Sequence, residues 1–140
     1  MPLVFEEGGW HRWSPGAGGS GAIVDLREMP SEQRGKWGPG VVHHVAWRVP
    51  DDHAELAARA QVAGAGAQPT EVIDRFWFRS VYFREPGGVL FEIATDGPGF
   101  AVDEPAESLG ERLVLPPWFE QAREQIERGL PPLSAPAPIA

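Results

Sequence analysis

The sequence predicts an α+β fold whose main unit is one βαβββ module over residues 41–96. Three observations predict it: a long β-type run comes first, a stretch of helical composition follows it, and three further strand-like runs come after that. Glycine and proline, 17 and 15 of the 140 residues, separate these runs. The same punctuation divides the chain into three parts, at residues 1–40, 41–96 and 97–140.

Residues 1–40 are expected to hold part of a preceding module and a linker. Two short strands, LVFEE and WHRW, flank a Gly-Gly pair, which is typical of a hairpin. The sequence PGAGGSG at residues 15–21 predicts a flexible loop, and GAIVDLRE predicts one more strand.

The module itself begins with a strand at residues 41–49, VVHHVAWRV, which the following proline stops. The acidic pair at residues 51–52 suits a helix start, because a carboxylate there accepts the free amides of the first turn. Leu56, Ala60 and Ala63 recur at helical spacing, and the glycines at 64–66 end the helix. Three strands are then expected, with the sequences TEVIDRFW, FRSVYFRE and VLFEIAT, the last two joined by PGG.

Residues 97–140 are expected to form a turn, a helix and a tail. The turn has the sequence DGPGF, and the helix is WFEQAREQIERG, with Pro117 in its first turn and Gly129 at its end. The tail, LPPLSAPAPIA, is rich in proline, which predicts an extended or disordered segment.

Composition excludes several classes of protein. There are 12 Lys and Arg against 20 Asp and Glu, a formal net charge of −8, which argues against binding nucleic acid or an anionic membrane surface. No cysteine is present, so disulfides, zinc-thiolate sites and a cysteine nucleophile are excluded. The N-terminus does not have the pattern of a signal peptide, and no apolar run reaches the roughly 20 residues that span a bilayer. We therefore expect a cytoplasmic protein.

Two adjacent histidines in the first strand of the module are candidate functional residues. Neighbours in a strand point to opposite faces of the sheet. His44 would share a smaller, more polar face with Ala46 and Arg48, as a ligand cavity requires, whereas His43 would share an apolar face with Trp47. Taken singly, each histidine is better explained as a satisfied core residue.

Glu92 is harder to explain as a structural residue, because its strand, VLFEIAT, has no other polar group before its final threonine. A buried carboxylate needs a partner or a metal. If PGG is a three-residue loop, Tyr82 stands directly opposite Glu92, about 5 Å away between Cβ atoms. The alternative is a strand face that alternates into solvent.

One histidine and one carboxylate form a weak signal by themselves. Two or three such groups on a concave sheet would suit a divalent first-row metal. Iron(II) bound by two histidines and one carboxylate is the obvious candidate, because that site leaves positions open for substrate and dioxygen.

Two stretches, GPGVVHHVAWRVPDD and FRSVYFREPGGVLFEIATD, resemble the C-terminal half of the hydroquinone-type ring-cleaving dioxygenases. These belong to the vicinal-oxygen-chelate superfamily of glyoxalases, bleomycin resistance proteins and extradiol dioxygenases. The resemblance covers most of residues 21–133. It implies iron(II) or manganese(II), with zinc(II) or nickel(II) as alternatives, bound by His44 and Glu92. It also implies that His43, Arg75 and Tyr82 surround the oxygens of a small aromatic diol.

The implied reaction is oxygen-dependent ring cleavage, in which His43 or Tyr82 handles protons and Arg75 stabilises anionic charge. In the superfamily, two modules pair so that their sheets form one cupped cavity. Only one complete module is expected here, and a lone open sheet buries little apolar surface. We therefore expect a partner chain, either a second copy in a homodimer or a separate N-terminal half. A glyoxalase-like metal enzyme and a non-catalytic small-molecule-binding module are the alternatives.

Overall fold

A computed structural model describes residues 1–14, 22–33 and 35–131. The loop expected at residues 15–21 and all but the first two residues of the proline-rich tail lie outside these ranges. The chain divides into two compact units, Met1–Val41 and Val42–Ala140, which are described separately below.

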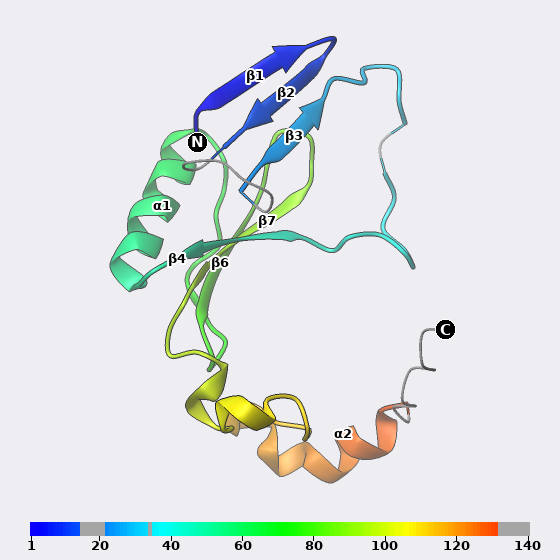
Figure 1. Ribbon diagram of the computed structural model, residues 1–140. Helices are drawn as coiled ribbons and strands as arrows, with labels where there is room; N and C mark the ends of the chain where they lie inside the picture. The colour runs from blue at the N-terminus through cyan, green and yellow to red at the C-terminus, as the bar shows by residue number, and fades with distance from the viewer. Residues whose placement is uncertain (15–21, 34, 132–140) are drawn as a thin grey trace. The chain divides into compact units, whose positions relative to one another are not determined.

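The first unit is a three-stranded antiparallel sheet in the order β1-β2-β3 (Figure 1). Its strands are β1 (Leu3–Glu7), β2 (Trp10–Trp13) and β3 (Val24–Arg27). The predicted hairpin is confirmed: Gly8 and Gly9 have φ values of 55° and 79°, which a two-residue hairpin turn with positive φ at both positions requires. The third strand is also confirmed, although it is shorter than expected.

The second unit contains the predicted β-α-β-β-β order. Its sheet has the order β4-β7-β6-β5, with β4 (Val45–Val49), β5 (Ile73–Asp74), β6 (Arg79–Arg84) and β7 (Leu90–Thr95). The first strand lies parallel to the last, and the other pairs are antiparallel. Two expectations of length were wrong: β4 begins four residues later than predicted, and β5 is only two residues long because the chain turns after it.

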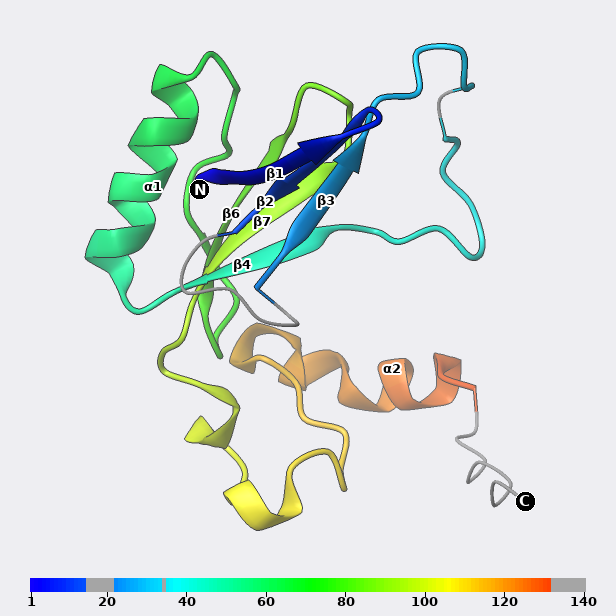
Figure 2. The same ribbon diagram turned by 45° about the horizontal axis from the view of Figure 1, so that its top comes forward.

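Helix α1 (Asp52–Gly64) covers one face of this sheet, as Figure 2 shows, and contacts β4, β6 and β7. The predicted cap is present, since the Asp51 carboxylate accepts a hydrogen bond from the Ala54 amide at 2.8 Å. The spacing of Leu56 and the alanines predicted the helix but not its packed face: Leu56 is 54% exposed, and the fully buried residue is Glu55.

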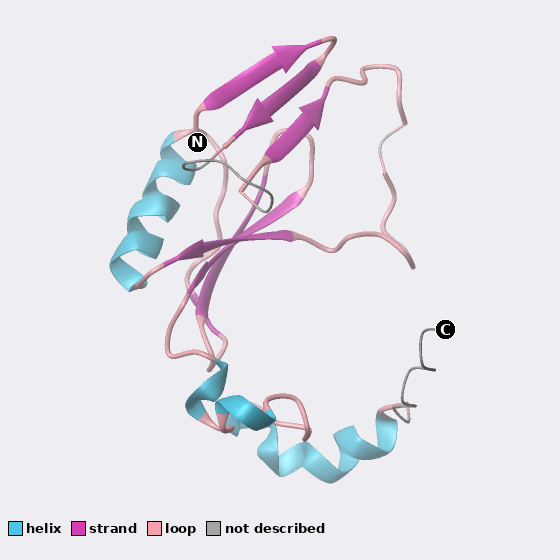
Figure 3. Ribbon diagram, in the orientation of Figure 1, coloured by secondary structure: helices cyan, strands magenta, loops and turns pink. Residues whose placement is uncertain are grey.

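The core of the described residues is small. Only Val81 and Ile93 are both apolar and buried among them, and both lie on the strand face toward α1. The opposite face, which carries Tyr82 and Glu92, is not covered by a second layer of helices in the described part of this unit (Figure 3). The sheet is therefore stabilised mainly on one side.

The chain after β7 forms short helices, η1 (Phe100–Val102), η2 (Ala106–Ser108), η3 (Pro117–Ala122) and α2 (Arg123–Gly129). The predicted C-terminal helix begins and ends where expected, but its first six residues are 3₁₀ helix. Arg123 bonds to Glu120 and Glu127 at the junction of η3 and α2. Within the described ranges, no helix has the length and apolar character needed to cross a membrane.

Candidate metal and substrate site

His44 and Glu92 meet on the open face of the sheet. Ala46 of β4 pairs with Glu92 of β7, and His44 lies two residues before Ala46, so its ring falls beside the Glu92 carboxylate. His44 Nε2 lies 2.7 Å from Glu92 Oε2. The Glu92 side chain is only 5% exposed, whereas the His44 ring is one-third exposed. A buried carboxylate and an accessible imidazole nitrogen thus face each other at one point.

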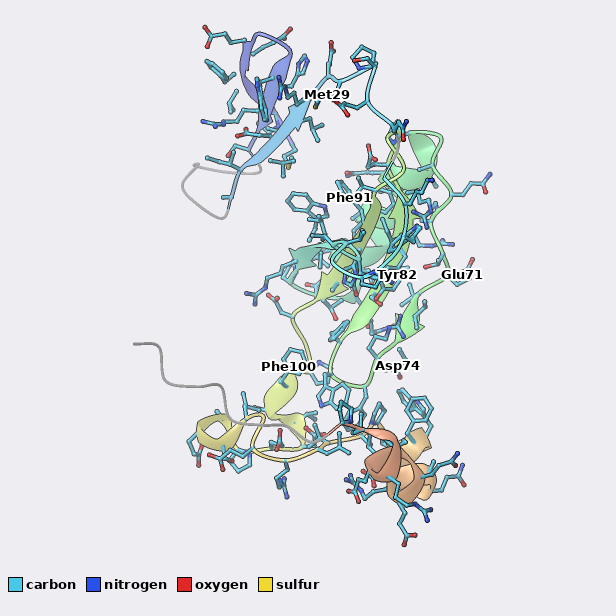
Figure 4. All side chains as sticks on the ribbon, turned by 90° about the vertical axis from the view of Figure 1, so that its right-hand side faces the viewer. Met29, Glu71, Asp74, Tyr82, Phe91 and Phe100 are labelled. Atoms are coloured by element: carbon cyan, nitrogen blue, oxygen red, sulfur yellow. The ribbon has the colours of Figure 1, made fainter. Side chains whose placement is uncertain are left out.

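Tyr82 engages the second oxygen of the same carboxylate. The hairpin register predicted across the PGG loop is confirmed, with Tyr82 directly opposite Glu92. The phenol of Tyr82 donates to Glu92 Oε1 at 2.7 Å, and its ring makes an edge contact with the His44 ring at 5.9 Å. Tyr82 lies near the middle of the sheet in Figure 4.

Arg75 extends this chain of contacts by one step. Its Nη2 donates to the phenol oxygen of Tyr82 at 3.3 Å, and its guanidinium carbon lies 5.4 Å from the centre of the Tyr82 ring. A cation over an aromatic face is favourable. Arg75, Tyr82, Glu92 and His44 therefore form one connected row.

The placement of His43 differs from the prediction. The two histidines do not point to opposite faces: their rings are perpendicular at 5.0 Å, and the two Nδ1 atoms are 2.7 Å apart. The physical reason is that β4 begins only at Val45, so the strict alternation of a strand does not apply to residues 43 and 44. One Nδ1 must donate and the other accept, which couples the tautomers of the two rings.

A cavity of about 450 Å³ opens beside Glu92. Its floor is formed by the small side chains of Ala46 and Ala94, which flank Glu92 on the same face. Aromatic rings from the β5–β6 turn and η1 form its wall: Trp77, Phe78 and Phe100. Phe100 contacts both other rings, at 6.2 and 6.1 Å between centroids.

One end of the cavity carries charge. Arg48 donates to Asp96 at 2.7 Å, so this end presents a paired guanidinium. Of the predicted site residues, only Glu92 lines this cavity; His43, His44, Arg75 and Tyr82 do not, although His44 and Tyr82 contact the Glu92 carboxylate. A larger cavity, about 610 Å³, lies against η3 and α2 and contains none of the predicted site residues.

The donor set fits a divalent metal but is incomplete. An imidazole nitrogen and a carboxylate oxygen are the ligands such a metal prefers. Among the described residues, no group of three or more His, Cys, Asp or Glu is placed to hold a metal. A third protein ligand would have to come from elsewhere.

Sequence reasoning missed the aromatic wall of the cavity. The sequence predicts strands for Trp77 and Phe78 and a turn for Phe100. Their proximity depends on how the segment after β7 folds back, with the Gly99 amide bonded to the Trp77 carbonyl at 2.8 Å. No spacing in the sequence indicates that contact.

Residues 1–93 match the family model of the glyoxalase/bleomycin resistance protein/dioxygenase superfamily. The chain belongs to this superfamily, and the βαβββ unit with its open site-bearing face is consistent with that fold.

Its relatives include ring-cleaving enzymes. The chain is 48% identical over 132 residues to the "Putative ring-cleaving dioxygenase MhqO" of Bacillus subtilis, and 36% identical over 127 residues to the chlorohydroquinone/hydroquinone 1,2-dioxygenase of Sphingobium indicum. A crystal structure of a "putative dioxygenase" from Bacillus subtilis superimposes with a TM-score of 0.86 at 46% identity.

These matches cover most of this chain but less than half of each relative. They span 94%, 87% and 95% of the chain, against 42%, 39% and 42% of the respective relatives. The chain thus corresponds to about two fifths of the length of these proteins.

Proposed function

We propose that this chain supplies His44 and Glu92 to the metal centre of a dioxygenase that cleaves the ring of small aromatic diols. The observation that carries the proposal is the Glu92 carboxylate, which is buried and held between the imidazole of His44 and the phenol of Tyr82. Burying a carboxylate is costly unless it is hydrogen-bonded or coordinates a metal. Relatives named as ring-cleaving and hydroquinone dioxygenases support the same reading.

Iron(II) is the metal that best suits the proposed chemistry, with manganese(II), zinc(II) and nickel(II) as alternatives. When bound, ferrous iron would supply open coordination positions and the redox chemistry that activates dioxygen. The overall reaction breaks one carbon–carbon bond of the ring, and both atoms of dioxygen enter the ring-opened product.

The surrounding residues would position the substrate and move protons. Tyr82 orients Glu92 by donating its phenol proton to Oε1, and it would influence a substrate hydroxyl bound beside the carboxylate through Glu92. Arg75 places positive charge next to that phenol, which favours anionic oxygen on the substrate. With a metal bound, His43 Nδ1 would accept a hydrogen bond from His44 Nδ1–H, so that His44 Nε2 carries no proton and can bind the metal.

The aromatic cavity is the proposed site of the substrate ring. Trp77, Phe78 and Phe100 offer an apolar wall against which a substrate ring could pack. The small floor leaves room for a ring directly beside Glu92. Because the Arg48 guanidinium is already paired with Asp96, the cavity favours a neutral diol over a substrate with a second anionic group.

We further propose that the open face is completed by another segment or chain that brings the third ligand. An uncovered small sheet buries too little apolar surface. A second copy of the chain in a homodimer and a separate polypeptide are the two candidates. A two-fold homodimer would place two histidines and two glutamates around one centre, which favours a glyoxalase-like enzyme as the second candidate function.

The test is oxygen uptake after anaerobic loading with iron(II). Hydroquinone, chlorohydroquinone and catechol are offered in turn, and ring-opened product is followed by absorbance. We expect uptake by the wild type and by His53→Ala, which removes an exposed histidine at the start of α1, and loss of uptake in His44→Ala. Bound metal with isomerase or lyase activity but no oxygen uptake would favour the glyoxalase-like alternative, and failure to bind metal would favour a non-catalytic binding module.

A further inference from the structure

The turn between β5 and β6 holds a strained residue. Phe76 has a φ of 72°, and it is the one residue other than glycine with positive φ in the described ranges. A bulky side chain in that region costs free energy and persists only where surrounding contacts impose it. Phe76 is the first residue of a two-residue hairpin turn, a position that ordinarily takes glycine when φ is positive.

Two hydrogen bonds hold the chain in this conformation. The Asp74 carboxylate accepts from the Phe76 amide at 2.7 Å, and the Arg75 amide donates to the Phe78 carbonyl at 2.9 Å. Asp74 ends β5, where it pairs with Arg79, and it lies close to the lower edge of the sheet in Figure 4. The backbone of Arg75 is therefore fixed from both sides.

The far side of the turn is also anchored. Trp77 Nε1 donates to the Asp103 carboxylate at 3.0 Å, and the Trp77 carbonyl accepts from the Gly99 amide at 2.8 Å. The turn cannot relieve its strain by moving Trp77 without breaking these bonds. If the turn relaxed, residues 74–76 would therefore move, and Arg75 is among them.

The orientation of Arg75 depends on this turn. The pairing of β5 with β6 places Arg75 opposite Phe78. Tyr82 lies four residues further along β6, past Ser80, so the Arg75 side chain must extend back along the sheet to meet it. It does so, with 3.3 Å between Nη2 and the phenol oxygen. A change of the Phe76 backbone to negative φ would redirect the Arg75 side chain away from this contact.

We propose that Asp74 is a positioning residue: by holding the strained turn at Phe76, it sets the guanidinium of Arg75 over the phenol of Tyr82. The catalytic meaning of this contact rests on the proposed function, since Tyr82 acts there through Glu92.

The chain offers a direct spectroscopic probe, because Tyr82 is its only tyrosine. Labelling tyrosine with ¹³C at the phenol carbon gives one NMR resonance, whose position reports the hydrogen bonds of that oxygen. Arg75→Met should move the resonance. Asp74→Ala should move it in the same direction, by more than half as much, whereas Asp74→Asn should leave it in place because the amide oxygen can still accept from Phe76.

Two further variants separate positioning from general destabilisation. Asp51→Ala removes a matched aspartate that also accepts a backbone amide, at the start of α1; it should lower the melting temperature but leave the Tyr82 resonance unmoved. Phe76→Gly added to Asp74→Ala should restore the resonance, because glycine adopts positive φ without strain.

The inference is overturned if Asp74→Ala leaves the resonance at its wild-type position while Arg75→Met moves it, or if neither variant moves it. Initial rates with hydroquinone form a separate arm. Under the proposed function, Asp74→Ala should lower kcat at least fivefold with little change in KM. If the resonance shifts as expected but no variant, wild type included, consumes oxygen, the positional inference stands and the proposed function fails.

Discussion

Replacing Tyr82 with phenylalanine removes one oxygen atom. It separates the proposed role of Glu92 as a metal ligand from its role as the hydrogen-bond partner of Tyr82. The lost hydrogen bond, 2.7 Å to Glu92 Oε1, involves a carboxylate in a residue that is only 4% exposed. Hydrogen bonds to charged groups contribute about 1.5–3 kcal/mol. The substitution removes the hydrogen bond to Oε1 of Glu92. The other carboxylate oxygen, Oε2, faces His44 and should keep its position. We therefore expect the metal dissociation constant to change by less than about tenfold and the rate of oxygen uptake to fall about a hundredfold.

The assay combines manganese(II) binding, followed by the loss of the free-ion EPR signal, with oxygen-electrode rates at saturating hydroquinone. Thr70→Val is the matched control, since it also deletes a hydroxyl that contacts Tyr82, but at the Tyr82 backbone amide. It should leave both quantities near the wild-type values. A metal affinity that falls by the same factor as the rate would refute the reasoning and would assign Tyr82 to holding the metal ligands together.

Three further predictions follow from particular contacts. Ala94→Leu fills the floor of the cavity beside Glu92 and should raise KM for chlorohydroquinone by about tenfold or more, while manganese(II) affinity is unchanged. Asp51→Ala removes the cap of α1 and should lower the free energy of unfolding by about 1 kcal/mol in urea titrations; an unchanged midpoint would show that the cap is dispensable. Burial raises the pKa of Glu55 above its ordinary value of 4.5, with Arg79 opposing the rise and Asp52 adding to it. Both Glu55 oxygens have no hydrogen-bond partner among the described residues. The contribution of Glu55 to stability is therefore fully present below about pH 4.5 and is lost as the pH rises through the raised pKa. Glu55→Gln should remove this dependence of stability on pH, because glutamine does not ionise. The melting temperature of the variant should therefore exceed that of the wild type at neutral pH but not in acid.

The sequence was most informative where local pattern determines the result. The alternation of FRSVYFRE and VLFEIAT around PGG predicted a hairpin register that places Tyr82 opposite Glu92, because the pleat of a strand has a fixed period of two residues. The start of α1 was predicted equally well, since the chemistry of an aspartate cap is local.

Prediction was weaker where tertiary contacts decide the conformation. The strand around the two histidines was expected to start at residue 41, yet β4 starts at Val45, and the rings of His43 and His44 touch. Strand propensity does not say where pairing stops. The buried side of α1 was also missed: Glu55 faces the sheet while Leu56 is exposed, against the ordinary preference of both side chains.

The turn after β5 shows the same limit. TEVIDRFW reads as a strand, but it breaks after Asp74 because Asp74 binds the Phe76 amide and Phe76 takes a positive φ. Phenylalanine carries no signal for that conformation. The sequence also gives no candidate for a third ligand to the proposed metal, and the described residues bring no third His, Cys, Asp or Glu to His44 and Glu92.

The central claim, that His44 and Glu92 together hold a divalent metal, is tested most directly by manganese(II) binding to four proteins: the wild type, His44→Ala, Glu92→Gln and His53→Ala. The account predicts that the wild type and His53→Ala bind with the same affinity, and that His44→Ala and Glu92→Gln each weaken binding at least about tenfold. Equal binding by all four proteins, or weakening in only one of the two site variants, would contradict it.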